Sequence, residues 1–329
     1  MKALFKLFIL TLLITVSSCS TTQKLKKDFK NNQKESEFFK GFVLYNPETR
    51  TQIINHNGAK FFTPASNTKL YTFYSAYRTL GDSIKGLEYV KKNDTLFIKG
   101  TADATFLYGF DYSKTIPFLN NHDGPIVLID ESINDNRLGS GWSWSDYHYY
   151  YMPEKSLLPM YGNLAIYSLA GDSVKVTPKH FSKNIAIVDS LMVNRDYEKN
   201  QFYLERGDSS LYDIPFKTST KLVAKLLSDT LNKPVNTTTK KFTEDFKELY
   251  SVPTDSVYKQ MLVVSDNFIA EQLMLQVGKE TSNSYNVGDA IAYSLENYLP
   301  NIPHKPRWVD GSGLSRYNLF TPEGTIHWG

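Results

Sequence analysis

The chain has 329 residues, of which 41% are hydrophobic and 22% charged, and its formal net charge is +3. This composition is that of a globular protein, which excludes an intrinsically disordered chain, and the length allows two domains or one domain with a large insertion. A net charge this small and this dispersed argues against nucleic acid as a partner.

Residues 1–18 have the pattern of an export signal. A positively charged start precedes the apolar segment Leu7–Val16, which is too short to remain as a transmembrane helix. The next residues, Val16-Ser17-Ser18-Cys19, resemble the lipobox of bacterial lipoproteins. That resemblance implies cleavage before Cys19 and attachment of a lipid to its thiol. A plain secretory signal with an incidental cysteine is the alternative, and both interpretations predict an exported protein.

Cys19 is the only cysteine of the chain, so no internal disulfide is expected despite an oxidising compartment. Ser20 follows it, which by the same resemblance implies a periplasmic protein anchored to the outer membrane through the lipid. The polar, lysine-rich residues 19–37 are expected to form a flexible tether.

A helix that begins near Pro64 and ends at Gly81 is predicted to carry the first reactive group. Apolar side chains recur there at helical spacing, at Leu70, Phe73, Tyr74, Tyr77 and Leu80. Ser66 would then lie in the first turn, and Lys69, three residues on, would share its helical face. A lysine in an apolar pocket tends toward the neutral amine, which can take a proton from a hydroxyl. The Ser-x-x-Lys pattern alone is weak, because Ser256 and Lys259 also match it.

Residues 88–246 have a different texture and are expected to form a β-rich insertion, with one amphipathic helix over Thr218–Leu231. Within it, Trp142 and Trp144 would point to one face of an extended strand. They would stack on a sugar or peptide, or pack in the core or at a domain interface, and the second reading is favoured. The same choice applies to the whole aromatic content of 14%, since Tyr is also common in β-strands.

Two further helices are predicted after Pro253, the second of them ending at Gly278. The turn between them contains Ser265-Asp266-Asn267, where a hydroxyl and an amide two residues apart can face one cleft. Glycines in Asp310-Gly311-Ser312-Gly313 indicate a tight loop close to a groove.

In this order the motifs resemble the serine D-alanyl-D-alanine carboxypeptidase/endopeptidase family, which belongs to the low-molecular-mass class C penicillin-binding proteins. The motifs that carry the resemblance are Pro64-Ala65-Ser66-Asn67-Thr68-Lys69, Gly100-Thr101-Ala102-Asp103, Asp130-Glu131-Ser132, Trp142-Ser143-Trp144-Ser145-Asp146, Ser265-Asp266-Asn267 and Asp310-Gly311-Ser312-Gly313-Leu314-Ser315-Arg316. The implied fold is α+β, a β-lactamase/transpeptidase-like domain formed by residues 38–87 and 247–329, in which helices pack on an antiparallel sheet, and residues 88–246 are its insertion.

The resemblance implies acyl transfer on peptidoglycan stem peptides. Ser66 would attack the carbonyl between two D-alanines or at a cross-link, and Lys69 would take its proton. Ser265 would relay a proton to the leaving amine, and Asn267 would hold the substrate backbone or Lys69. The remaining implied substrate-binding residues are Asp266, Ser312 and Gly313. β-Lactam antibiotics would acylate the same serine, and no metal or cofactor is called for.

One family motif is missing: the 329 residues contain no Lys-Thr-Gly or His-Thr-Gly, and the nearest match is Lys217-Thr218-Ser219. The sequence therefore predicts a C-terminally truncated member with impaired or absent catalysis. A non-catalytic, peptidoglycan-binding lipoprotein is the alternative function. A serine β-lactamase is a third hypothesis, disfavoured by the large insertion and by Ser265.

Overall fold

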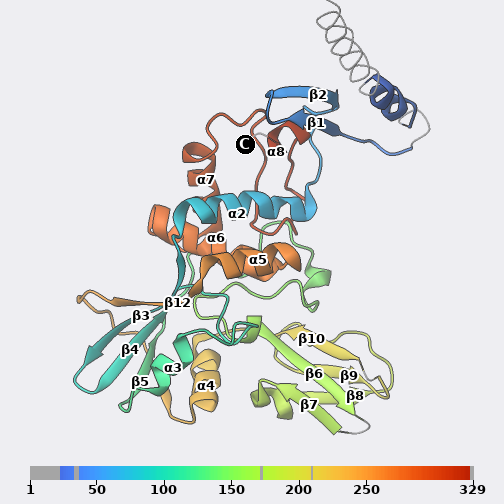
Figure 1. Cartoon of the computed structure of the whole chain (residues 1–329). Helices are drawn as coiled ribbons and strands as arrows, with labels where there is room; N and C mark the ends of the chain where they lie inside the picture. The colour runs from blue at the N-terminus through green and yellow to red at the C-terminus, as the bar shows by residue number, and fades with distance from the viewer. Residues whose placement is uncertain (1–22, 33–36, 171–172, 209, 327–329) are drawn as a thin grey trace, which may run out of the picture. The chain divides into compact units, whose positions relative to one another are not determined.

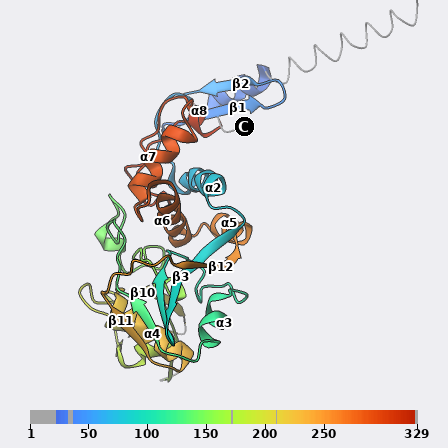
Figure 2. The same ribbon diagram turned by 90° about the vertical axis from the view of Figure 1, so that its left-hand side faces the viewer.

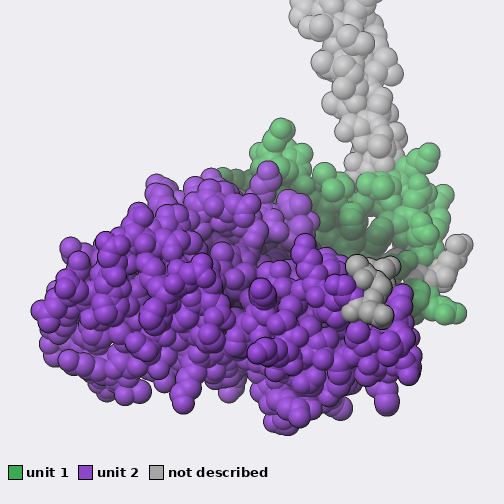
Figure 3. All heavy atoms as spheres, turned by 90° about the horizontal axis from the view of Figure 1, so that it is seen from below, with its two compact units in different colours: residues 1–63, 301–307, 319–329 green, residues 64–300, 308–318 purple. Residues whose placement is uncertain are grey.

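The computed structural model describes residues 23–32, 37–170, 173–208 and 210–326. They fall into two compact units, which Figure 3 colours separately. The predicted signal segment and Cys19 lie outside the described residues. Residues 23–32 are helical, although the sequence predicts a flexible tether there. Among the described residues, no helix has both the length and the apolar character needed to cross a membrane.

The smaller unit comprises residues up to 63, 301–307 and 319 onward. Its hairpin pairs β1 (Phe42–Asn46) with β2 (Thr51–His56) in antiparallel register. The short helix α8 (Pro322–Thr325) joins it, since the Glu323 amide donates to the Gly58 carbonyl at 3.1 Å. A bridge between Phe62 and Phe320 ties together segments that are far apart in the sequence.

The larger unit, residues 64–300 and 308–318, contains a group of helices. These are α2 (Thr68–Thr79), α5 (Thr254–Val263), α6 (Asn267–Ser282) and α7 (Val287–Asn297). The helix α6 packs against α2, α5 and α7 (Figures 1 and 2). Its residues from Phe268 to Gly278 are all buried, and these include the polar Glu271, Gln272 and Gln276.

A five-stranded sheet in the order β11-β5-β4-β3-β12 belongs to the same unit. Its strands are β3 (Ser83–Lys92), β4 (Thr95–Gly100), β5 (Ile126–Ile129), β11 (Val235–Thr238) and β12 (Lys247–Pro253). β4, β5 and β11 run parallel, whereas β3 is antiparallel to both of its neighbours. The helices α3 (Thr115–Asn120) and α4 (Thr220–Leu231) accompany it, and Leu227 of α4 shares a buried core with Leu87 and Ile98 of the sheet.

The rest of the larger unit is built from shorter strands. β6 (Leu164–Ala170) lies between β7 (Ser173–Thr177) and β10 (Leu211–Pro215), and β8 (Ile185–Val188) pairs in parallel with β9 (Phe202–Glu205). The larger unit also contains short 3₁₀ turns, at Ala65–Asn67 (η1), Trp144–Asp146 (η2), Tyr161–Asn163 (η3) and Lys179–Lys183 (η4).

The predicted α+β class and the β-rich insertion are confirmed. The expected boundary between residues 87 and 88 lies inside the continuous strand β3, which pairs with β12 from beyond the insertion. The strand predicted for the two tryptophans is absent, and the predicted packing is wrong for Trp144, whereas Trp142 is half-buried and donates to buried Asp310 at 2.8 Å. Trp144 begins a 3₁₀ turn rather than a strand, and its side chain is 74% exposed rather than packed in a core. Turn-forming Gly139 and Gly141 on one side and Asp146 on the other explain why this stretch does not extend.

Candidate active site

Ser66 lies in the 3₁₀ turn that leads into α2, just before the helix itself begins at Thr68. Ala65 has a positive φ of 48°, an uncommon conformation for a residue with a side chain, and it turns the chain sharply ahead of Ser66. Ser66 is exposed and Lys69 is only 1% exposed, so the two side chains meet at the edge of the helix layer.

The Lys69 amine has three polar neighbours. Its Nζ lies 2.6 Å from Asn267 Oδ1, 2.8 Å from the Ser312 carbonyl oxygen and 3.3 Å from Ser66 Oγ. The amide and carbonyl oxygens can only accept hydrogen bonds. A neutral amine has two N–H groups and one lone pair, so donation to these two oxygens leaves the lone pair for the Ser66 hydroxyl. The arrangement therefore suits a proton acceptor for Ser66.

Burial lowers the pKa of Lys69 from 10.5 to about 8, and the nearby carboxylates of Glu271, Asp266 and Asp310 oppose this change. Glu271 on α6 is itself fully buried, and burial, with help from Asp310, raises its pKa to about 7. Its Oε1 accepts from the Ser312 amide at 2.8 Å, while its Oε2 has no hydrogen-bond partner. The site thus holds a lysine whose pKa, about 8, lies well below the ordinary 10.5.

The turn between α5 and α6 brings the second group of predicted residues to the same place. Ser265 is exposed with a positive φ of 57°, which reverses the chain between the two helices. Asp266 caps α6 by accepting from the Ile269 amide at 2.9 Å, and its other oxygen accepts from the Tyr108 hydroxyl at 2.9 Å. Both Asp266 oxygens are therefore engaged within the protein.

The amide of Asn267 has a fixed orientation. Its Nδ2 donates to the Tyr151 carbonyl at 3.0 Å, so Oδ1 faces Lys69. The segment that contains Tyr151 comes from the insertion, and this contact joins it to the Ser66–Lys69 pair. Asn267 thus links three parts of the larger unit in a single contact chain.

The loop 310–313 contacts Lys69 on the buried side of the site. Asp310 is buried and accepts four hydrogen bonds, from the amides of Gly313 and Ser315 and from the side chains of Trp142 and Asn318. Ser312 is fully buried, with its carbonyl on Lys69 and its amide on Glu271. Its side chain accepts from the Leu314 amide at 3.3 Å, so its contribution in this structure is a scaffold for Lys69.

Gly313 has a positive φ of 84°, and a Cβ there would lie 1.9 Å from the Ala65 carbonyl oxygen. Only glycine fits this position. The loop and the turn before Ser66 therefore touch through their backbones.

Ser66, Ser265 and Asn267 all line one cleft of about 610 Å³. Its lining includes Ser66, Ser265 and Asn267 from the helix layer, Tyr150 and Tyr151 from the insertion, and Asp213 from β10. Asp213 Oδ1 is buried without a hydrogen-bond partner, and burial raises the pKa of this carboxyl group. Ser256 and Lys259, the second Ser-x-x-Lys match in the sequence, lie on α5, where Lys259 is exposed.

The structure thus gathers Ser66, Lys69, Ser265, Asp266 and Asn267 around one cleft, with Ser312 and Gly313 behind Lys69. Sequence reasoning missed Glu271, Asp213 and the Tyr151 carbonyl. Glu271 is the one charged residue among the buried residues Phe268–Gly278 of α6, and a charge among mainly apolar residues was a usable signal. Neither Asp213 nor a backbone carbonyl leaves such a mark in the sequence.

Solved structures show the fold that the chain adopts. Penicillin binding protein 4 from Haemophilus influenzae matches with a TM-score of 0.70 at 19% sequence identity, over 87% of this chain and 73% of that chain. The same protein complexed with a novel β-lactam matches with a TM-score of 0.61 at 20% identity, over 88% and 73% of the two chains. The chain therefore has the fold of this penicillin-binding protein.

The family follows from the sequence model of the D-Ala-D-Ala carboxypeptidase 3 (S13) family, which matches residues 22–187 and 217–326. The chain belongs to this family, which confirms the resemblance seen in its motifs. No curated protein matches the sequence.

Proposed function

We propose that the protein is a serine-type D-Ala-D-Ala carboxypeptidase/endopeptidase that acts on peptidoglycan stem peptides through an acyl-enzyme. The observation that carries this proposal is the set of three contacts around the Lys69 amine. The Asn267 and Ser312 oxygens accept from the two N–H groups of the neutral amine, and Ser66 Oγ lies 3.3 Å from the nitrogen, on the side left for its lone pair. The family membership supports the substrate class.

In the proposed reaction, the neutral Lys69 amine takes the Ser66 proton as Oγ attacks the carbonyl carbon of the D-Ala-D-Ala amide bond. The C–N bond then breaks, and the leaving amine receives a proton through Ser265. Water hydrolyses the resulting ester and frees Ser66. The Ser66 backbone N–H is a proposed donor to the oxyanion, a kind of contact whose removal costs about 10²–10³ in rate. Asp266, Ser312 and Gly313 hold the backbone and side chains around Ser66 and Lys69 in position.

A non-catalytic, peptidoglycan-binding protein is the second candidate function. Under this alternative the cleft binds stem peptides without turnover.

Labelling with a fluorescent penicillin tests both. The β-lactam complex of penicillin binding protein 4 shows that a protein of this fold accommodates such a compound. We expect a covalent adduct that disappears in Ser66→Ala and persists in Ser256→Ala, the decoy serine on α5. Release of D-alanine from a soluble pentapeptide should follow the same pattern. Folded protein that forms no adduct would favour the non-catalytic alternative, and rapid turnover of penicillin would favour a β-lactamase.

The proposal also includes export and attachment of a lipid to Cys19. The lipid would anchor the protein to the outer membrane, with its catalytic part in the periplasm. Metabolic labelling with a fatty acid should mark the wild type and leave Cys19→Ala unlabelled. Label in Cys19→Ala would contradict attachment at this thiol.

A further inference from the structure

An aromatic track crosses the surface of the insertion. We define it by the side chains of Trp144, Tyr197, His148, Tyr149, Tyr151 and Tyr150. Trp144, Tyr150 and Tyr149 are 74%, 62% and 45% exposed, respectively. Exposed aromatic rings that form a contiguous set mark an interaction site.

The rings of the track contact one another without a gap. The Trp144 ring lies 5.6 Å from that of Tyr197, which lies 6.1 Å from that of His148. His148 is 4.5 Å from Tyr149, and Tyr149 stacks on Tyr151 at 5.6 Å with an interplanar angle of 9°. Tyr150 completes the series, edge-on to Tyr151 at 5.4 Å.

One end of the track is the active-site cleft. Tyr150 and Tyr151 line this cleft together with Ser66. The Tyr151 carbonyl accepts the hydrogen bond from Asn267 that orients the amide toward Lys69. A ligand bound along the track would therefore reach the cleft in which Ser66 lies.

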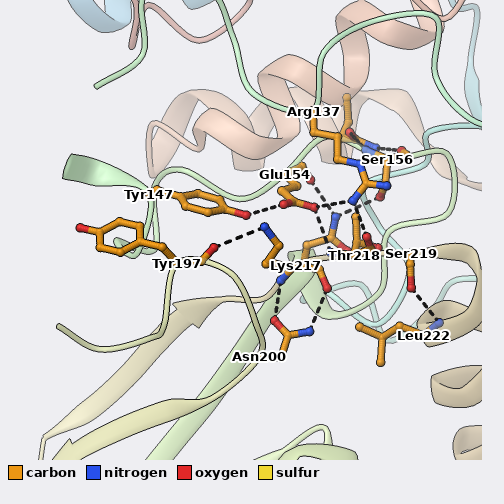
Figure 4. A network of polar contacts seen from close by, with 12 residues as sticks. Arg137, Tyr147, Glu154, Ser156, Tyr197, Asn200, Lys217, Thr218, Ser219 and Leu222 are labelled. Carbon is orange, nitrogen blue, oxygen red and sulfur yellow. Dashed lines mark hydrogen bonds and ion pairs between the residues drawn. The ribbon is translucent and has the colours of Figure 1, made fainter. Parts of the chain in front are cut away.

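A polar network holds Tyr147 and the backbone of Tyr197, the second residue of the track (Figure 4). The Tyr147 hydroxyl donates to buried Glu154, whose Oε2 also accepts from the Thr218 amide at 2.9 Å. The Arg195 guanidinium lies 4.4 Å from the centre of the Tyr147 ring. The Lys217 amine donates at 3.3 Å to the backbone carbonyl of Tyr197, whose ring lies next to that of Trp144 (Figure 4). Fixed rings lose little conformational freedom when a ligand binds.

The chemistry of the rings selects the ligand. The track is made of Trp, Tyr and His, which combine an apolar face with a polar edge. The negative face of such a ring attracts the C–H groups on one face of a pyranose, while the polar edge bonds its hydroxyls. A stem peptide is attached to a strand of amino sugars, so the occupant that fits a track leading from Ser66 is that strand.

We propose that the aromatic track binds the glycan strand of peptidoglycan and presents its attached stem peptide to Ser66. The proposal rests on the proposed function for its choice of sugar, and it adds a binding site for a second part of the substrate. Trp144, at the outer end, is the ring whose loss should weaken sugar binding without removing a contact near the reacting bond.

Direct binding of N-acetylglucosamine oligomers to the full chain tests it, measured by calorimetry. We expect Trp144→Ala to weaken binding by about tenfold or more, the scale for losing one stacked ring. Trp144→Phe should restore part of the loss. Tyr112→Ala, which removes another exposed ring of the larger unit, should bind like the wild type. Equal binding by Trp144→Ala and the wild type, or no binding by the folded wild type at millimolar sugar, would overturn the proposal.

A second measurement separates this proposal from the proposed function. Ser66→Ala should bind the oligomers like the wild type, because Ser66 is not part of the track. In turnover, Trp144→Ala should lose more activity on glycan-linked peptide than on the soluble pentapeptide. If penicillin forms no adduct but sugar binding depends on Trp144, the acyl-transfer function fails and the sugar site stands. If Trp144→Ala instead abolishes self-association and sugar never binds, the track is a contact between copies of the chain and the proposal is wrong.

Discussion

Lys69 Nζ and Asn267 Oδ1 meet at 2.6 Å although 198 positions separate the two residues in the chain. The contact exists because α6 packs against α2, so that the first turns of the two helices lie side by side. The Tyr151 carbonyl holds the Asn267 amide so that its oxygen, not its nitrogen, faces the amine. This oxygen accepts from Lys69 without adding a charge, which keeps the neutral amine accessible.

Replacing Asn267 with aspartate tests that last point. Asn267→Asp places a carboxylate beside Lys69 and stabilises its charged form, so the pKa of Lys69 should rise by about one unit or more. The acid limb of the penicillin acylation rate should then move to higher pH by a similar amount. Asn267→Ala serves as the control, since it removes the contact without adding charge. An unchanged midpoint in Asn267→Asp would show that Lys69 does not take the Ser66 proton.

The pH dependence of the wild type follows from the lowered pKa of Lys69. The amine accepts a proton only when it is neutral, so the acylation rate should rise with pH and reach half its maximum near the pKa of about 8. The Glu271 carboxylate raises that pKa, so Glu271→Gln should lower it and move the midpoint to lower pH. Glutamine keeps an acceptor for the Ser312 amide. A midpoint that moves upward in Glu271→Gln would contradict this electrostatic role.

Asp310 should be a stability determinant of the larger unit. Asp310→Asn replaces one of its oxygens with an NH₂ group that faces N–H donors, in a site that is 1% exposed. Losing charge-assisted hydrogen bonds and leaving buried donors unpaired should lower the free energy of unfolding by at least about 2 kcal/mol. Urea denaturation measures the change, with exposed Asp111→Asn as the control. Equal stability of Asp310→Asn and the wild type would mean that water replaces the lost contacts.

Local patterns predicted the parts of the site that depend on short spacings. Helical periodicity located α2, and the interruption between two apolar helices located the Ser265–Asn267 turn. The sequence could not show that the loop 310–313 touches Ala65 through its backbone, because such a contact depends on tertiary packing. Trp144 illustrates the opposite error. Its residue type favours burial, but the turn around it leaves the ring exposed.

Gly313 provides a test of how closely the loop 310–313 controls the nucleophile. In Gly313→Ala the new Cβ would meet the Ala65 carbonyl oxygen at 1.9 Å, so the backbone directly before Ser66 must move. Because a displacement of about 1 Å can cost roughly 10²-fold in rate, we expect penicillin acylation to fall by about that factor. Gly81→Ala is a matched control: Gly81 also has a positive φ, of 66°, but nothing lies within 4 Å of its added Cβ. Both variants carry the same conformational penalty of about 1–2 kcal/mol, so only the contact with Ala65 distinguishes them. Equal acylation rates in the two variants would show that the loop does not position Ser66.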